Sequence, residues 1–230
     1  IGEQGQTFEG EWRAVKGSKW FESFDLYKEN GFKEREKAQQ VIDYLTQEQP
    51  VIGQIASIEK KKEKKNPPLL FNLAELQNEC SKRFKISPDE TLKIAQELYE
   101  KKLTTYPRTD ARVLSTAVAK EIHKNLNGLM KYEPAVLFLQ EIVGFGSHKG
   151  LAKTRYVNDK QITDHYAIIP TGQGMSALSG LSWTSRAVYD VIVRRFLSIF
   201  YPAAVYQKVA ITTKVKEESF FASFKVLAEP

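Results

Sequence analysis

The feature that most constrains the fold is a change of pattern along the chain. Both ends carry the alternating or aromatic patterns of strands, whereas the middle carries helix signals. The first end is separated from the middle by the run EKKKEKKNPP at residues 59–68, whose charges and two prolines indicate a solvated connector. We therefore place a domain boundary near residue 66.

The middle of the chain is expected to be helical because residues with capping preferences recur at its segment ends. Asn72 and Ser87 stand at N-cap positions with an acidic residue three places later, and Gly128 is expected to end a helix. Helices are predicted over residues 72–84, 87–102, 115–128, 133–144 and 184–200.

The two ends are expected to pair with each other. Residues 203–229 have the pattern of a two-stranded hairpin, which is only marginally stable without a sheet to join. Before the boundary we predict strands joined by turns over 7–32, a helix over 33–49 and a strand over 51–59. The fold class is therefore α+β, with a helical domain (67–200) inserted into a β-rich domain (1–66 and 201–230). The alternative is three consecutive small units.

The composition indicates a globular protein of a reducing compartment. The net charge of +6 and the pI of about 9.2 suit a polyanion partner without demanding one. The sole cysteine, Cys80, excludes an internal disulfide and a multi-cysteine zinc site. The sequence has neither an apolar run of membrane-spanning length nor a signal-peptide pattern, so we expect a cytoplasmic protein without a membrane partner. Because Ile1 opens the chain, we expect a piece of a longer protein.

The segment KKLTTYPRTDARVLS, residues 101–115, carries the chemistry of greatest interest. Pro107 disfavours helical geometry at Tyr106, so Tyr106 and Arg108 are predicted to project on one face of an extended segment. At a phosphodiester, a phenol can attack phosphorus while a guanidinium binds the non-bridging oxygens.

Two segments resemble motifs of one enzyme family. TTYPRTD, residues 104–110, closely resembles the active-site segment of type IA DNA topoisomerases, in which the tyrosine of T-Y-x-R-[ST]-D forms a phosphotyrosine with the 5′ end of a cut strand. NDKQITDHYAIIPT, residues 158–171, resembles the N-D-K and H-x-A-I-x-P-T segment of the family and follows at about the expected separation. The Y-P-R form is more similar to the topoisomerase III branch than to the topoisomerase I branch.

The resemblance implies a role for each matched residue. Tyr106 is then the nucleophile, Arg108 binds the phosphate and His165 lies near the cleaved bond, while Thr109 and Asp159 contact DNA. It also implies that residues 67–200 form a CAP-like, winged-helix-type domain and that the β-rich ends form the arch of the enzyme. The expected partner is single-stranded DNA, which is cut, held open for strand passage and resealed without ATP.

The stretch SHKGLAKTRYVNDK, residues 147–160, is rich in basic side chains. It is either a solvated loop or a strip that contacts DNA, with cations at phosphates and Tyr156 stacked on an unpaired base. The cations expected to make these contacts are Lys149, Lys153, Arg155 and Lys160.

The family's magnesium site is expected to lie outside this chain. Members carry a Toprim domain with an acidic D-x-D cluster that binds Mg2+, and this sequence contains no D-x-D. We therefore expect no metal in the chain itself, the missing Toprim and other domains as partners, and an isolated fragment that is inactive. Two other classes remain open, a non-catalytic winged-helix nucleic-acid binder and a tyrosine recombinase or type IB enzyme that forms a 3′ adduct.

Overall fold

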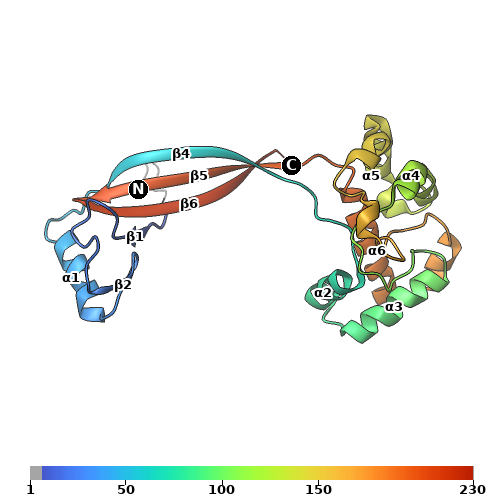
Figure 1. The fold of residues 1–230 in the computed structure, drawn as a ribbon, viewed down its shortest axis with the longest axis horizontal. Helices are drawn as coiled ribbons and strands as arrows, with labels where there is room; N and C mark the ends of the chain where they lie inside the picture. The colour runs from blue at the N-terminus through green and yellow to red at the C-terminus, as the bar shows by residue number, and fades with distance from the viewer. Residues whose placement is uncertain (1–6, 230) are drawn as a thin grey trace. The chain divides into compact units, whose positions relative to one another are not determined.

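The computed structural model describes residues 7–229. The chain divides into two compact units (Figure 1). One unit combines the residues up to Lys65 with those from Ala203 onward, and the other consists of Asn66–Pro202. The helical unit is therefore inserted into a β-rich one, which rules out three consecutive units.

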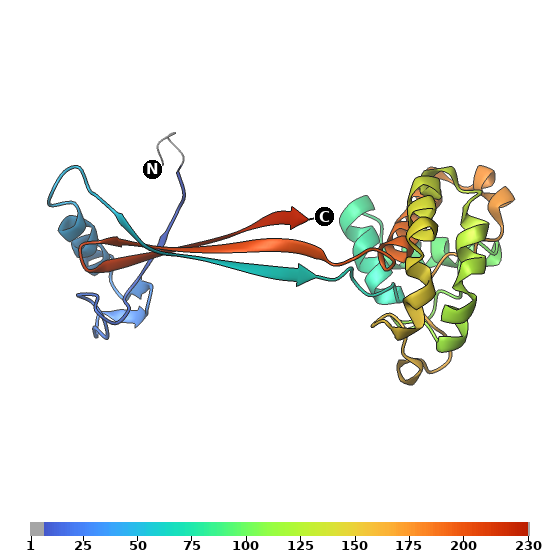
Figure 2. The ribbon, with the colours of Figure 1, turned by 90° about the horizontal axis from the view of Figure 1, so that it is seen from above.

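The β-rich unit is built on a four-stranded sheet with strand order β1-β6-β5-β4, in which all neighbours are antiparallel. Figure 2 shows the three long strands running alongside one another. The sheet strands are β1 (Glu11–Arg13), β4 (Gln54–Lys65), β5 (Ala204–Val215) and β6 (Glu218–Glu229). A short pair, β2 (Leu26–Lys28) and β3 (Gly31–Phe32), and one helix, α1 (Arg35–Leu45), complete the unit.

The sequence predicted a solvated connector at the lysine-rich run before the two prolines. This prediction is wrong, because most of the run is part of a strand. β4 extends through Lys65, and Lys65 itself pairs with Ala204 on β5. Every side chain of β4 is exposed, and the strand forms one edge of the sheet. Lysines suit such an edge, since their charge discourages pairing with a further strand. Charge alone therefore misidentified a segment whose structure depends on a distant partner.

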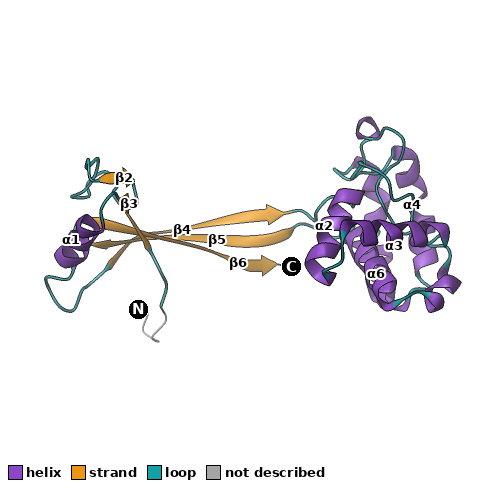
Figure 3. Cartoon of the chain, turned by 90° about the horizontal axis from the view of Figure 1, so that it is seen from below, coloured by secondary structure: helices purple, strands orange, loops and turns teal. Residues whose placement is uncertain are grey.

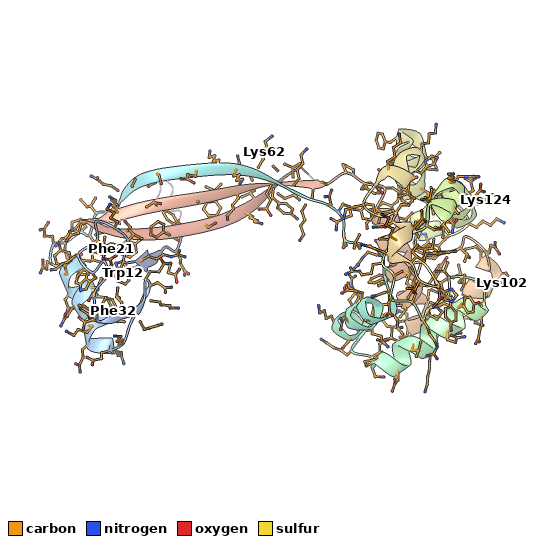
Figure 4. The ribbon with its side chains drawn as sticks, viewed as in Figure 1. Trp12, Phe21, Phe32, Lys62, Lys102 and Lys124 are labelled. Atoms are coloured by element: carbon orange, nitrogen blue, oxygen red, sulfur yellow. The ribbon has the colours of Figure 1, made fainter. Side chains whose placement is uncertain are left out.

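A buried carboxylate ties the start of the chain to β6. Glu218 is fully buried and accepts hydrogen bonds from Trp12 Nε1 at 2.7 Å, Ser18 Oγ at 2.7 Å and the Lys19 amide at 2.8 Å. The Trp12 ring also stacks on Phe32 with 5.2 Å between centroids, and Figure 4 labels both residues. Hydrogen bonds to a charged group contribute about 1.5–3 kcal/mol each. Much of residues 7–32, predicted as strands, is held in irregular structure by such contacts.

The second unit contains most of the helices (Figure 3) and one large apolar core. The core is formed by leucine, isoleucine and aromatic side chains, among them Leu98, Leu126 and Phe196, which are at most 1% exposed. The α-helices are α2 (Leu73–Phe84), α3 (Pro88–Glu100), α4 (Thr116–Leu129), α5 (Val136–Phe145) and α6 (Trp183–Ser198). Short 3-10 helices are η1 (Glu133–Ala135), η2 (Ser147–Lys153), η3 (Asp159–Gln161) and η4 (Met175–Gly180).

The predicted helix starts are confirmed where the capping chemistry is local. Asn72 accepts from the Glu75 amide and Ser87 from the Glu90 amide, as N-caps do. The prediction for Gly128 is wrong, because α4 continues through it to Leu129. Gly128 instead permits close contact, since a Cβ there would lie 2.1 Å from the Gly172 carbonyl oxygen.

Candidate active site

The two motif segments lie side by side in the second unit. The Thr105 amide donates to the Ile169 carbonyl at 3.0 Å, and Thr104 pairs with Pro170 in an isolated bridge. The Thr105 hydroxyl donates to the Ala167 carbonyl and accepts from the Ile169 amide, both at 3.0 Å. Segments about sixty residues apart in sequence therefore form one surface.

Tyr106 and His165 meet on that surface. Their ring centroids are 4.5 Å apart, and the Tyr99 ring lies edge-on to Tyr106 at 5.3 Å. Tyr106 is half-buried and His165 is exposed, so the phenol is not sealed in the core. Both residues line an open pocket of about 360 Å³, whose other walls are Tyr99, Lys102, Thr104, Thr105, Tyr166, Thr171 and Gln173.

Three pocket residues were not singled out from the sequence. Tyr99 lies near the end of α3, Lys102 follows that helix, and Gln173 follows the second motif. The one signal in the sequence that could have identified Tyr99 is its place near the end of a predicted helix, a few residues before the first motif. Tyr166 also packs against the core, and burial raises the pKa of its phenol.

Arg108 does not share a pocket with Tyr106, contrary to the predicted alternation. The Thr109 amide donates to the Pro107 carbonyl at 3.0 Å, which closes a three-residue turn centred on Arg108. This turn breaks the strand-like alternation, and the exposed Arg108 lines a separate hollow beside α3 with Asp89, Glu97 and Glu100. A phosphate-binding role for Arg108 therefore requires its side chain to move from this position.

A DNA contact through Thr109 would require its hydroxyl to face solvent, and it does not. Thr109 is 7% exposed, and its hydroxyl donates to the His165 carbonyl at 2.8 Å and accepts from the Ala111 amide at 3.1 Å. Together with Thr105, it fixes the segments that carry Tyr106 and His165 relative to each other.

Replacing Thr109 tests this positioning role. Thr109→Val is isosteric but leaves the His165 carbonyl and the Ala111 amide without this partner, so we expect a loss of about 1–3 kcal/mol in unfolding free energy. Thr109→Ser should restore most of it. Chemical denaturation measures the loss, and a DNA titration checks the alternative. Weaker DNA binding at unchanged stability would assign Thr109 to the DNA instead.

Asp159 has a structural partner of its own. Its carboxylate accepts from the Thr116 amide at 2.8 Å and from the Thr116 hydroxyl at 2.5 Å, at the start of α4. These hydrogen bonds hold the pKa of the Asp159 carboxyl below its ordinary value, with the side-chain bond the larger cause. The carboxylate therefore anchors η3 to α4, and the structure gives no support to a direct DNA contact.

In the basic stretch 147–160 the cations are exposed and could reach DNA, whereas Leu151 and Tyr156 are buried in the core. The cations Lys149, Lys153, Arg155 and Lys160 are exposed. The prediction that Tyr156 stacks on a base does not fit, because its side chain is 5% exposed and its hydroxyl donates to the Pro67 carbonyl at 2.8 Å. Burial also raises the pKa of the Tyr156 phenol. Tyr156 lies in the turn between η2 and η3 and packs inward, although its neighbours in sequence include several cations.

Residues 7–229 contain neither a candidate metal-binding cluster nor a candidate membrane-spanning helix. No group of three or more His, Cys, Asp and Glu side chains in these residues is arranged to hold a metal ion. Within the same range, no helix combines the length and apolar character needed to span a membrane.

Comparison with known proteins agrees with both motifs. A family model described as DNA topoisomerase matches residues 8–230. DNA topoisomerase 3 of Bacillus subtilis (strain 168) is 40% identical over 176 residues, which cover 75% of this chain and 23% of the relative. DNA topoisomerase 3 of Bacillus anthracis is 36% identical over 181 residues, with the same two coverages. The chain thus spans about a quarter of the length of these relatives.

A solved structure shares the fold. Full-length topoisomerase I from Thermotoga maritima matches with a TM-score of 0.57 over 88% of this chain and 31% of that chain. At 20% identity, this likeness shows the fold alone. The sequence matches decide the assignment: the chain belongs to the type IA DNA topoisomerase family, and the relatives described above are topoisomerases III.

Proposed function

We propose that this chain carries the nucleophile of a type IA topoisomerase that cuts one strand of DNA. The observation that supports this is the half-buried Tyr106, set beside His165 in an open pocket. The phenol oxygen attacks a backbone phosphorus, the bond to the deoxyribose 3′ oxygen breaks, and the cut strand keeps a 5′-phosphotyrosine. Reversal of the same exchange reseals the strand after another strand has passed. One phosphoester replaces another, so ATP is not consumed.

The surrounding residues have distinct proposed roles. His165 lies against the Tyr106 ring, where an imidazole can hold or exchange a proton near the reacting phosphate. Arg108 turns from its hollow beside α3 to neutralise charge on the non-bridging oxygens. The exposed Lys149, Lys153, Arg155 and Lys160 bind the backbone of single-stranded DNA. The β-rich unit serves as the arch, in a DNA-associated cytoplasmic protein.

Magnesium belongs, in this proposal, to a Toprim domain in another part of the longer protein. When bound, it supplies positive charge beside the scissile phosphate. The described residues of this chain offer no cluster of three or more metal-ligating side chains. We therefore expect the 230-residue chain alone to leave supercoiled plasmid DNA unchanged in magnesium buffer. Gel electrophoresis checks this, and relaxation that disappears on Tyr106→Phe would contradict it.

Covalent trapping tests the proposed chemistry. A single-stranded oligonucleotide, labelled at either end, is incubated with the chain and the remaining domains supplied on a second polypeptide. An adduct at Tyr106 joined to the 5′ phosphate of the cut strand supports the proposal. A 3′ adduct indicates the recombinase or type IB class, and tight binding without an adduct indicates a winged-helix binder.

A further inference from the structure

The two faces of the sheet differ in charge along β4. Side chains alternate between faces, so Lys60, Lys62 and Lys64 lie on one face. Their cross-strand partners on β5 are Val209, Gln207 and Val205, and the partners of these on β6 are Phe224, Val226 and, at the end of the strand, Glu229. We call this surface, Lys60, Lys62 and Lys64 with Val205, Gln207, Val209, Phe224 and Val226, the lysine face. Its side chains comprise cations, one amide and apolar groups.

The opposite face has mixed charge. Glu63 lies there between Lys61 and Lys65, and its carboxylate binds Lys225 Nζ of β6 at 2.8 Å. The hydrogen bond from Lys225 lowers the pKa of the Glu63 carboxyl, with smaller contributions from Lys208 and Lys61. The three cations of the lysine face make no ion pair within the described residues, and no carboxylate stands among them on β4. On the opposite face Lys61, Lys65 and Lys208 are likewise without an ion pair there, but Lys61 and Lys65 flank Glu63. The positive charge of the lysine face is therefore available to a ligand.

The lysine face also has an apolar floor. Val205 and Val209 are 9% and 8% exposed, whereas Phe224 and Val226 are 42% and 52% exposed. Lysine side chains can lie along apolar surface while their ammonium groups reach water. All three lysines are exposed on an edge strand, and Figure 4 labels Lys62 there. The result is a row of cations beside an exposed aromatic ring and an exposed valine.

We propose that the lysine face binds single-stranded DNA, with phosphates along the lysine row and bases against Phe224 and Val226. Alternate residues of a strand are about 6.7 Å apart. The rise of about 3.4 Å per strand in a duplex is only the axial part of the distance between neighbouring phosphates, so the lysine spacing is compatible with neighbouring phosphates of either form. The preference for a single strand comes from the exposed ring and valine beside the lysines. Aromatic and apolar groups stack on unpaired bases and have no access to bases within a duplex. The proposal rests on the proposed function only in its choice of DNA.

A different reason for the lysines would be protection of an open sheet edge from pairing with another strand. Protection of the edge needs charge on either face, whereas DNA binding needs it on one. Two triple variants with equal loss of charge therefore separate the two explanations. The first changes Lys60, Lys62 and Lys64 to glutamine. The matched control changes Lys61, Lys65 and Lys208 to glutamine, and these three lysines are exposed on the opposite face.

Salt dependence of binding is the measurement. Fluorescence anisotropy follows the 230-residue chain binding to labelled oligothymidylate between 50 and 200 mM salt. Three phosphate contacts to a single strand contribute about −2 to the slope of log affinity against log salt. Between 50 and 200 mM salt these contacts account for an affinity loss of about 20-fold in the wild type, and the first variant should lack this part of the loss. The control should keep nearly the wild-type slope. An unchanged slope in the first variant, or equal flattening in both, overturns the proposal.

One further variant completes the test. Phe224→Ala should weaken oligothymidylate binding by at least about fivefold and leave duplex binding nearly unchanged. Equal loss for both ligands would overturn the single-strand assignment. Covalent trapping reports on Tyr106 in the helical unit and this titration on strands of the β-rich unit, so a failure of the lysine face leaves the trapping result intact, and the reverse also holds. Unfolding midpoints confirm that each variant is folded.

Discussion

Tyr106→Phe is expected to lower the rate of covalent strand capture by about 10^4-fold or more. The substitution removes one hydroxyl and keeps the ring, which packs against His165 at 4.5 Å and edge-on to Tyr99 at 5.3 Å. Because the ring contacts remain, stability and DNA affinity should change little. The rate is measured as adduct formation on a labelled oligonucleotide, with the remaining domains supplied.

The neighbouring tyrosine provides the matched control. Tyr99→Phe also removes one phenol hydroxyl from the same pocket and keeps the edge-on ring contact. We expect it to retain covalent capture within about threefold, since its hydroxyl is not the attacking group. Equal loss in both variants would mean that capture depends on the hydroxyls of the pocket collectively. Adduct formation by Tyr106→Phe would show that another residue is the nucleophile.

The parts of the fold that were predictable from sequence depend on local chemistry. Asn72 and Ser87 accept hydrogen bonds from amides three residues later, so a few neighbouring residues suffice to place the starts of α2 and α3. The hairpin of β5 and β6 follows from alternation around a short turn. The lysine-rich half of β4 was missed because its strand geometry comes from pairing with β5, which lies far away in sequence.

The candidate site divides in the same way. Tyr106 and His165 were identified from motifs, and the structure brings their rings together. The position of Arg108 was not predictable from spacing, because a three-residue turn redirects its side chain. Burial of Thr109 and Tyr156 depends on which segments pack over them, and polarity alone gave both the wrong surroundings. Motif residues were thus easier to predict than their environment.

Gly128→Ala is expected to destabilise the helical unit by about 3 kcal/mol. In most helices the same change stabilises, because alanine is favoured over glycine by about 1 kcal/mol. Here a Cβ would lie 2.1 Å from the Gly172 carbonyl oxygen and 2.6 Å from its carbonyl carbon. Both contacts are with backbone, so α4 and the segment after the second motif must move apart. The movement would also disturb Thr171 and Gln173 in the pocket of Tyr106.

Gly144 offers the control for that prediction, because it lies inside α5 and nothing is within 4 Å of a Cβ built there. Gly144→Ala should therefore stabilise the unit by about 0.5–1 kcal/mol. Chemical denaturation followed by helical circular dichroism reports on the second unit, which holds most of the helices. Opposite signs for the two variants would establish that close packing of α4 on Gly172, and not helix propensity, governs this position. Stabilisation by both would show that the segment after the second motif moves aside at little cost, and the site would then be less rigidly supported than its contacts indicate.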